Sequence, residues 1–229
     1  MRVVILAAGR GKRLGELTQD TPKSLAIVAG QPIIKYILKA LPVEIKEIVL
    51  VVGYLGNKIR DQLGGTFGDL PIRYIEMNEL SGTGGALWQA REVLKGDKFL
   101  VLNGDDIYDR EELGLLVSRD LAFGLVRSPM PSPKYIDIEV DGGGIIKGHR
   151  RLNESMLGKN INMATGAYVL NHKVFDYELV KLSNGEYGLP QTILKMAQDV
   201  PMQGVFMENW HQINSQKDLQ RTEAVLKSV

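Results

Sequence analysis

The sequence predicts an α/β protein of three layers, α/β/α, in which helices cover both faces of a mixed, mostly parallel β-sheet. Three observations support this fold class. Short apolar runs rich in Val, Ile and Leu recur at residues 3–8, 48–52 and 99–102, as in strands that are buried on both faces. Segments with helical apolar spacing separate these runs. Each run ends in Gly or Asn-Gly, which is typical of the loops between strands and helices.

The first half of the chain alternates strands and helices. Residues 32–41 carry apolar side chains with the i, i+3, i+4 spacing of a helix, and Pro32 falls in its first turn. Residues 72–75 are expected to form a further strand, and residues 84–94 a further helix. A strand, a helix and a strand in this order form a βαβ unit, which predicts parallel pairing.

The second half shows a weaker pattern. Pro129, Pro131 and Pro133 bracket a turn, and the alternating residues 136–140, followed by three glycines, indicate a hairpin. The remaining expected elements are a strand at 167–170, a helix near 189–198, a strand near 203–206 and a helix at 217–226. No repeat or long linker divides the chain, so we expect a single domain over residues 1–229.

The composition limits the classes of partner. The chain has 28 Lys+Arg and 27 Asp+Glu, and this balance argues against the broad positive surface that nucleic acids or anionic membranes require. It has no cysteine, which excludes disulfides and thiolate catalysis. No apolar run approaches the roughly 18 residues of a membrane span. We therefore expect a cytoplasmic protein with no nucleic-acid or membrane partner.

A glycine-rich loop follows the first expected strand. Gly9 and Gly11 lie where backbone N–H groups can approach a phosphate, and Arg10, Lys12 and Arg13 add positive charge. The loop lacks the Gly-Lys-Ser/Thr ending of a Walker A motif and the third glycine of a dinucleotide motif. Its three cations suit a polyphosphate, and the alternative interpretation is a solvated turn with surface cations.

This loop forms a paired motif with the segment after it. Residues 6–14 (LAAGRGKRL) are followed by Thr21-Pro22-Lys23. Together they resemble the signature of the sugar-phosphate nucleotidylyltransferases, or NDP-sugar pyrophosphorylases. The resemblance covers most of the chain and implies a Rossmann-like, GT-A-like fold. It assigns about residues 1–120 to the nucleotide and about residues 121–229 to the sugar phosphate.

The resemblance also implies roles for single residues. Arg13 is expected to bind the β and γ phosphates, and Lys23 the α phosphate or the incoming sugar phosphate. Cations in both places suit the chemistry, because transfer at an α phosphate develops charge on the reacting centre and on the departing pyrophosphate. The nucleotide is expected to lie on the backbone of Leu6, Ala7, Ala8, Gly9 and Gly11.

A second glycine-rich segment, residues 79–87, resembles the base-recognition loop of the same family. Gly82 and Thr83 are the expected contacts to the base, whereas the alternative makes Thr83 the N-cap of a helix. Ser81 stands where the family usually has leucine, and no nearby glutamine matches the one that many uridylyl and thymidylyl enzymes present to the base. UTP, dTTP, GTP and CTP therefore all stay open as the nucleotide.

Acidic residues follow the strand at 99–102. Mg²⁺ takes one or two protein oxygens and completes its shell with water and phosphates, and a carboxylate at a strand end can supply one of them. The resemblance makes Asp105 the expected Mg²⁺ ligand, with Asp106 a lesser candidate. The alternative interpretation of this segment is a simple Asn-Gly-Asp turn.

The second metal ligand of the family comes from near the C-terminus. Residues 210–219 (WHQINSQKDL) resemble that segment, with Gln212 at the usual aspartate position and Asn214 next on the same strand face. N-acetylglucosamine-1-phosphate uridylyltransferases show a similar variant with asparagine. We therefore assign Asn214 as the ligand and keep Gln212 as the alternative. His211 is expected to pack or to face solvent rather than to bind metal.

The sugar side resembles the family in part. Thr165 and Gly166 resemble a sugar-contacting strand, and Glu186 an acidic residue before the next helix. The usual Y-G-x-I and E-K-P segments are replaced by YIDI at 135–138 and HRRL at 149–152. Arg150, or alternatively Arg151, is expected to replace the missing phosphate-binding lysine. The plainer interpretation of both is exposed arginines at the end of a strand.

The activity implied is NTP + sugar 1-phosphate → NDP-sugar + pyrophosphate, by Mg²⁺-assisted in-line attack on the α phosphate. The expected partners are thus a nucleoside triphosphate and a sugar 1-phosphate, and the sequence leaves open whether the protein forms a homo-oligomer. One alternative is a CTP-dependent phosphocholine cytidylyltransferase, which requires an aromatic cage for the quaternary amine. The other is a non-catalytic homologue that binds nucleotide sugars as a regulator.

Overall fold

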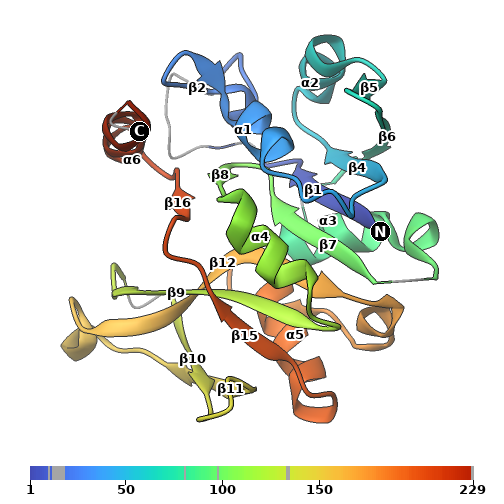
Figure 1. The fold of residues 1–229 in the computed structure, drawn as a ribbon. Helices are drawn as coiled ribbons and strands as arrows, with labels where there is room; N and C mark the ends of the chain where they lie inside the picture. Colours follow the sequence, from blue (N-terminus) through green and yellow to red (C-terminus); the bar gives the residue numbers. More distant parts are fainter. Residues whose placement is uncertain (10, 12–18, 80, 97, 133–134, 228–229) are drawn as a thin grey trace.

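A mixed β-sheet forms the centre of the protein. In the computed structural model, which describes residues 1–9, 11, 19–79, 81–96, 98–132 and 135–227, this sheet has eight strands in the order β15-β9-β12-β7-β1-β4-β6-β5 (Figure 1). Its strands are β1 (Arg2–Ala7), β4 (Glu47–Val52), β5 (Thr66–Phe67), β6 (Leu70–Glu76), β7 (Phe99–Asn103), β9 (Ala122–Pro129), β12 (Asn160–Leu170) and β15 (Gln203–Phe206).

The parallel part of the sheet corresponds to the first half of the chain. β1 pairs in parallel with both β4 and β7, and Val4 lies between Val49 and Val101. β12 is antiparallel to both of its neighbours, β7 and β9. The predicted α/β class with a mixed, mostly parallel sheet is confirmed. β9 was not predicted, because only its first four residues are fully buried and it ends at Pro129.

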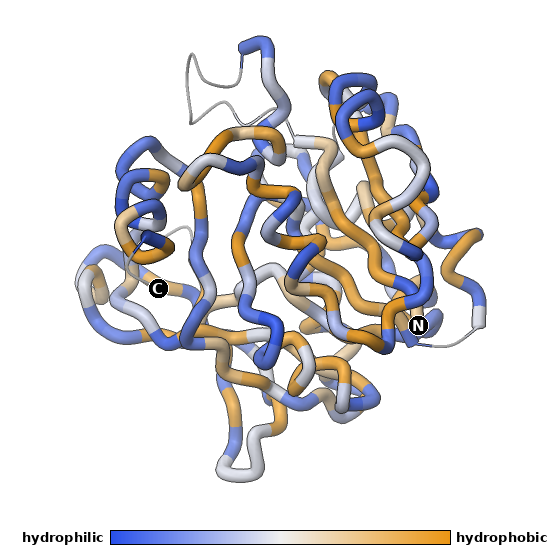
Figure 2. The backbone as a smooth tube through the Cα atoms, turned by 45° about the horizontal axis from the view of Figure 1, so that its top comes forward, coloured by the Kyte–Doolittle hydropathy of each residue, from blue (hydrophilic) through white to orange (hydrophobic). Residues whose placement is uncertain are grey.

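Helices cover both faces of this sheet. Alternate β1 side chains enter different cores, so Val3 and Ile5 pack on one face while Val4 and Leu6 pack on the other. Figure 2 shows apolar residues following the central strands. The first core includes residues of α1 (Ile33–Lys39), α2 (Gly56–Leu63) and α4 (Arg110–Val117), and the second includes residues of α3 (Gly82–Gln89) and α5 (Leu189–Asp199).

One predicted helix has different bounds in the structure, and two helices were not predicted. The helix predicted over 84–94 begins two residues earlier and ends at Gln89, after which Arg91–Leu94 form a 3-10 turn. α2 and α4 were not predicted from the sequence, since α2 buries few side chains and α4 contains Gly114 at its middle.

No helix in the described part of the chain is long and apolar enough to cross a membrane.

Short elements complete the fold and bring distant segments together. β16 pairs antiparallel with β8, so the segment near the C-terminus returns to the end of β7. The predicted hairpin is formed by β10 and β11. These elements and the rest are β2 (Ile27–Val28), β3 (Gln31–Pro32), β8 (Asp106–Ile107), β10 (Ile136–Val140), β11 (Ile146–Arg151), β13 (Val180–Lys181), β14 (Tyr187–Gly188), β16 (His211–Gln212), α6 (Gln216–Leu226) and the 3-10 turns Lys23–Leu25, Glu154–Met156 and His172–Asp176.

Candidate active site

A cavity of about 780 Å³ opens where the parallel strands β1 and β7 end. This is the edge at which open α/β sheets bind their ligands. Most of the residues singled out from the sequence line it. The lining comprises Leu6, Ala7, Ala8, Gly9, Gly11, Lys23, Ser24, Met77, Gly82, Thr83, Ala86, Asn103, Gly104, Asp105, Asp106, Asn184, Glu186, Gln212 and Asn214.

The end of β1 forms one wall of this cavity. The Gly104 N–H donates to the Leu6 carbonyl at 2.9 Å, which ties the end of β7 to the end of β1. A Cβ atom on residue 104 would lie 2.8 Å from that same carbonyl oxygen, so only glycine permits the approach. Asp105 therefore follows β7 directly into the cavity. Arg10, Lys12 and Arg13 of the predicted loop lie outside the described residues.

The first turn of α3 forms the opposite wall. The Ser81 carbonyl accepts a hydrogen bond from Tyr187 N at 2.8 Å, and Thr83 Oγ1 accepts one from Leu189 N at 3.2 Å. Thr83 thus supports the start of α5. The N-cap of α3 is Ser81 rather than Thr83, and the Ser81 side chain makes no cap hydrogen bond. These contacts hold Glu186 at the same cavity as Gly82 and Thr83.

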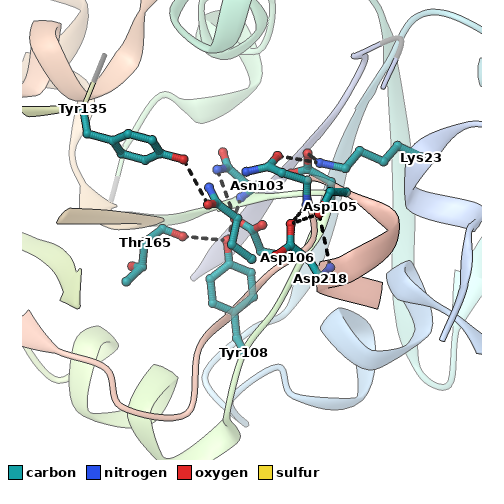
Figure 3. Close-up of polar contacts among 11 residues, drawn as sticks. Lys23, Asn103, Asp105, Asp106, Tyr108, Tyr135, Thr165 and Asp218 are labelled. Atoms are coloured by element: carbon teal, nitrogen blue, oxygen red, sulfur yellow. Dashed lines mark hydrogen bonds and ion pairs between the residues drawn. The ribbon is translucent and has the colours of Figure 1, made fainter. Parts of the chain in front are cut away.

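The buried ammonium group of a lysine lies in the cavity between two side-chain oxygens that accept its hydrogen bonds. Lys23 Nζ donates to a carboxylate oxygen of Asp105 and, at 3.1 Å, to Asn214 Oδ1 (Figure 3). The Lys23 side chain is only 9% exposed. The three residues come from the segment after β1, the end of β7 and the segment after β16, and the fold brings them to one point.

The same two oxygens fit a hard divalent cation. Asp105 offers a carboxylate and Asn214 an amide carbonyl, which are ligands of the kind that such ions prefer. The Lys23 ammonium shows that both oxygens can face one positive charge. The described residues contain no cluster of three or more His, Cys, Asp or Glu side chains suited to a metal. A two-ligand site of this kind suits an ion whose shell is completed by water and phosphate oxygens.

Asp106 differs from its neighbour Asp105. It is 2% exposed, and its carboxylate accepts a long hydrogen bond from Asn103 Nδ2 at 3.4 Å. Burial and, secondly, the charge of Asp105 raise the pKa of Asp106 to about 8, although Lys23 opposes this. Burial thus disfavours the charged form of Asp106, which makes it a weaker cation ligand than the more exposed Asp105.

Gln212 and Asn214, the two alternatives for the second ligand, both line the cavity but differ in their contacts. Gln212 Oε1 accepts a hydrogen bond from the Tyr135 hydroxyl at 3.2 Å. Asn214 Oδ1 instead faces Lys23, and its backbone N–H donates to Asp218 Oδ2 at 3.0 Å. Asp218, in the first turn of α6, thus holds the backbone of Asn214.

The structure does not bring three of the expected sugar-side residues into the cavity. Thr165 is fully buried, and its hydroxyl donates to Met207 Sδ at 3.3 Å. Gly166 has φ +75°, and a Cβ there would lie 2.1 Å from Asn103 Nδ2, so this glycine supports Asn103 from behind. Arg150 forms an ion pair with Asp137 at 2.6 Å on the β10–β11 hairpin.

Six residues of the cavity lining were not predicted as site residues, namely Ser24, Met77, Ala86, Asn103, Gly104 and Asn184. Asn103, Met77 and Asn184 line the cavity, and Asn184 Nδ2 donates to Glu186 Oε2 at 3.0 Å. Ser24 Oγ is buried on the cavity wall with no hydrogen-bond acceptor or donor among the described residues. The sequence carries a signal for Ser24 and Asn103 only through their neighbours Lys23 and Asp105, and none for Met77 or Asn184.

The fold and the cavity define an α/β protein with a site of about 780 Å³ that contains a buried cation at the ends of parallel strands. The family model described as nucleotidyl transferase matches residues 2–122, which is more than half of the chain. The chain belongs to the nucleotidyl transferase family. The matched region contains β1, the glycine loop, α3 and β7, which are the elements that form most of the cavity.

Individual relatives are similar over nearly the whole chain. The chain is 32% identical over 226 residues to the bifunctional protein GlmU of Methanococcus maripaludis, which covers 96% of this chain and 53% of that protein. It thus spans about half the length of that relative. It is 26% identical to the D-glycero-alpha-D-manno-heptose 1-phosphate guanylyltransferase of Campylobacter jejuni, over 86% of this chain and 88% of that one.

A solved structure shows the same fold. The inositol-1-phosphate CTP transferase of T. maritima superposes with a TM-score of 0.78 and 21% identity, covering 99% of this chain and 94% of that one. The central sheet and the two helical layers are therefore those of known nucleotidyl transferases.

Proposed function

We propose that the protein is a sugar-1-phosphate nucleotidylyltransferase, which converts NTP and a sugar 1-phosphate to NDP-sugar and pyrophosphate. A phosphate oxygen of the sugar attacks the α phosphorus of the nucleotide. The bond from that phosphorus to the bridging oxygen of the β phosphate breaks, and pyrophosphate leaves. The observation that carries this proposal is the convergence of Lys23, Asp105 and Asn214 on the floor of the cavity between the glycine loop and α3.

The described residues have distinct roles in this reaction. The nucleotide is held by the first turn of α3, with Gly82 and Thr83 at its base, and by the backbone of Leu6, Ala7, Ala8, Gly9 and Gly11. Lys23 stabilises the charge that develops at the α phosphate. Asp105 and Asn214 hold Mg²⁺, which when bound supplies Lewis-acid polarisation of the phosphate oxygens. No protein nucleophile is required, because a phosphate monoester is already largely ionised at neutral pH.

Other expected residues keep their proposed roles. We propose that Arg13 contacts the β and γ phosphates and that Glu186 contacts the sugar, since Glu186 lines the cavity next to α3. The nucleotide is one of UTP, dTTP, GTP or CTP. We place the reaction in the cytoplasm, because nucleoside triphosphates are abundant there. The chain has no cysteine, so it forms no disulfide and is compatible with a reducing compartment.

The cavity lining does not favour the phosphocholine alternative. A quaternary amine is bound by an aromatic cage, and the described residues of this lining include no aromatic side chain. A purely regulatory role is also less well supported, because it does not require the Lys23, Asp105 and Asn214 arrangement.

Pyrophosphate release over a panel of nucleoside triphosphates and sugar 1-phosphates, with Mg²⁺, tests the proposal. We expect turnover with at least one pair, and we expect Lys23→Ala and Asp105→Ala each to lower kcat by at least about 100-fold, because each removes one preorganised charge. Lys173→Gln, on an exposed 3-10 turn outside the cavity, serves as the control. Absence of turnover with every pair refutes the activity, and near-normal kcat in both alanine variants refutes the site.

A further inference from the structure

A second cavity of about 550 Å³ lies beside the candidate active site. Its walls come from the β10–β11 hairpin, from the segment around β13 and from α5. The lining comprises Tyr135, Ile136, His149, Arg151, Leu152, Val180, Lys181, Leu182, Ser183, Gln191, Leu194, Lys195 and Gln198. None of these residues lines the first cavity, so the proposed reaction does not explain the second cavity.

The two cavities share a wall. Residues 180–183 line the second cavity, and the next residues, Asn184 and Glu186, line the first. Tyr135 lines the second cavity, and its hydroxyl donates to Gln212 in the lining of the first (Figure 3). The shared wall ends at Glu186, the residue that we propose contacts the sugar. On that proposal, the acceptor lies on the side of the first cavity that adjoins the second.

The second cavity carries a positive charge that the protein does not neutralise. His149, Arg151, Lys181 and Lys195 line it, and its described lining contains no Asp or Glu. Lys195 Nζ donates to the Glu178 carbonyl at 3.5 Å. Within the described part of the chain, none of the four basic side chains forms an ion pair with a carboxylate. Unpaired cations around one concave site favour an anionic ligand.

The neighbouring residue Arg150 does form an ion pair, so the lack of a carboxylate partner is not a general property of the basic residues in the hairpin. Side chains alternate along a strand, so His149 and Arg151 share one face of β11 while Arg150 lies on the other. Arg150 pairs with Asp137, whose side chain is only 10% exposed. The hairpin thus neutralises the arginine that faces away from the cavity and leaves Arg151 available to a ligand, as guanidinium groups bind phosphate or carboxylate in a bidentate manner.

We propose that the second cavity binds an anionic group at the far end of the acceptor, so that the preferred substrate is a sugar 1-phosphate carrying a second phosphate or a carboxylate. This inference rests on the proposed function for the reacting phosphate. Arg151 and Lys181 make the principal contacts to the second anion, Lys195 enlarges the positive field, and the His149 imidazole offers a further hydrogen-bond donor. They determine specificity and take no part in bond making.

The test compares matched acceptors. Hexose 1-phosphates of glucose, mannose, galactose and N-acetylglucosamine are assayed against their 1,6-bisphosphates, together with glucuronic acid 1-phosphate. We expect kcat/KM to be at least about tenfold higher for an acceptor with the second anion, as one charge-assisted contact provides. The variant Arg151→Gln/Lys181→Gln should lose this preference, so that its kcat/KM values for the two acceptor types become equal, whereas Lys173→Gln should keep the preference. Equal kcat/KM for both acceptor types in the unmodified enzyme overturns the inference, and so does a preference that survives the double variant.

A binding measurement separates this inference from the proposed activity. If no acceptor releases pyrophosphate, the activity fails, and calorimetric titration with glucose 1,6-bisphosphate then decides the second site. Weaker binding to Arg151→Gln/Lys181→Gln by about tenfold supports the site, and equal or undetectable binding to both proteins overturns it. Inorganic phosphate is titrated in parallel. If it binds the unmodified protein as tightly as the bisphosphate does, the cavity takes a free anion and the assignment to the acceptor is wrong.

Discussion

Among single residues, Lys23 has two effects that oppose each other. Its ammonium is hydrogen-bonded to Asp105 and Asn214, the same two residues that we propose as metal ligands. A metal ion must therefore compete with an internal positive charge. In the reaction that we propose, the same charge stabilises the reacting phosphate. We therefore expect Lys23 to weaken metal binding to the free protein and to promote the reaction.

This competition can be measured with Mn²⁺ as the probe. Lys23→Met keeps the length and apolar stem of the side chain and removes its charge. We expect the Kd for Mn²⁺ without nucleotide to fall by at least about fivefold, because a like charge has left the site, while turnover is strongly reduced. Electron paramagnetic resonance titration reports free Mn²⁺ directly. Asp105→Asn serves as the opposite control, with weaker Mn²⁺ binding. An unchanged or higher Kd in Lys23→Met would contradict the shared use of these oxygens.

Among the elements, α6 positions a site residue that it does not contain. The Asp218 carboxylate accepts hydrogen bonds from Asn214 N at 3.0 Å and from Ser215 Oγ at 2.9 Å. Ser215 Oγ in turn accepts a hydrogen bond from Asp218 N at 3.2 Å, which caps the helix. The start of the helix therefore fixes the backbone immediately before it, which holds Asn214 in place.

Removing this support should have a small effect on folding and a larger one on the site. We expect Asp218→Ala to lower the free energy of unfolding by about 1 kcal/mol, as for loss of a cap interaction, and to weaken Mn²⁺ binding. Urea unfolding and the Mn²⁺ titration measure the two effects. Lys217→Ala, one residue earlier on the exposed surface, is the matched control. Unchanged metal binding in Asp218→Ala would show that Asn214 is positioned without α6.

Elements differ in how far the sequence predicts them. β1, β4 and β7 are buried on both faces, so their apolar runs are continuous and unmistakable. β9 is buried in its first half and alternates in its second, and α2 has Ile59 as its one buried large apolar side chain. Their patterns are correspondingly weak. These elements form through tertiary packing, which a local pattern does not contain.

The same distinction applies to the site. Lys23 and Asp105 each lie within a short local motif, so the sequence alone indicates both residues, although it does not indicate their contact. The second cavity was not predicted, because Arg151, Lys181 and Lys195 come from three separate elements and each alone resembles an ordinary solvated cation. The sequence also does not contain the strand register, which pairs Arg150 with Asp137 across the hairpin.

At the scale of the whole molecule, His211 links stability to pH. Burial lowers the pKa of His211, the charge of Arg221 adds to this effect, and Glu112 opposes it. Protonation is therefore more favourable in the unfolded chain, so stability should fall as the pH drops through the ordinary histidine value of about 6.5. We expect His211→Gln to have a flatter stability curve between about pH 7.5 and 5.5. Thermal unfolding measures this, with exposed His149→Gln as the control. A slope equal to that of the unmodified protein would refute the assignment.

The pairing of β16 with β8 also governs when the centre can assemble. Lys23 and Asp105 are synthesised before Asn214, which follows almost two hundred residues after Lys23. A nascent polypeptide can therefore form the β1–β4 core while it still lacks the Asn214 oxygen. The three groups can meet only after residue 214 has left the ribosome, so a shorter nascent chain lacks one of the two metal ligands that we propose.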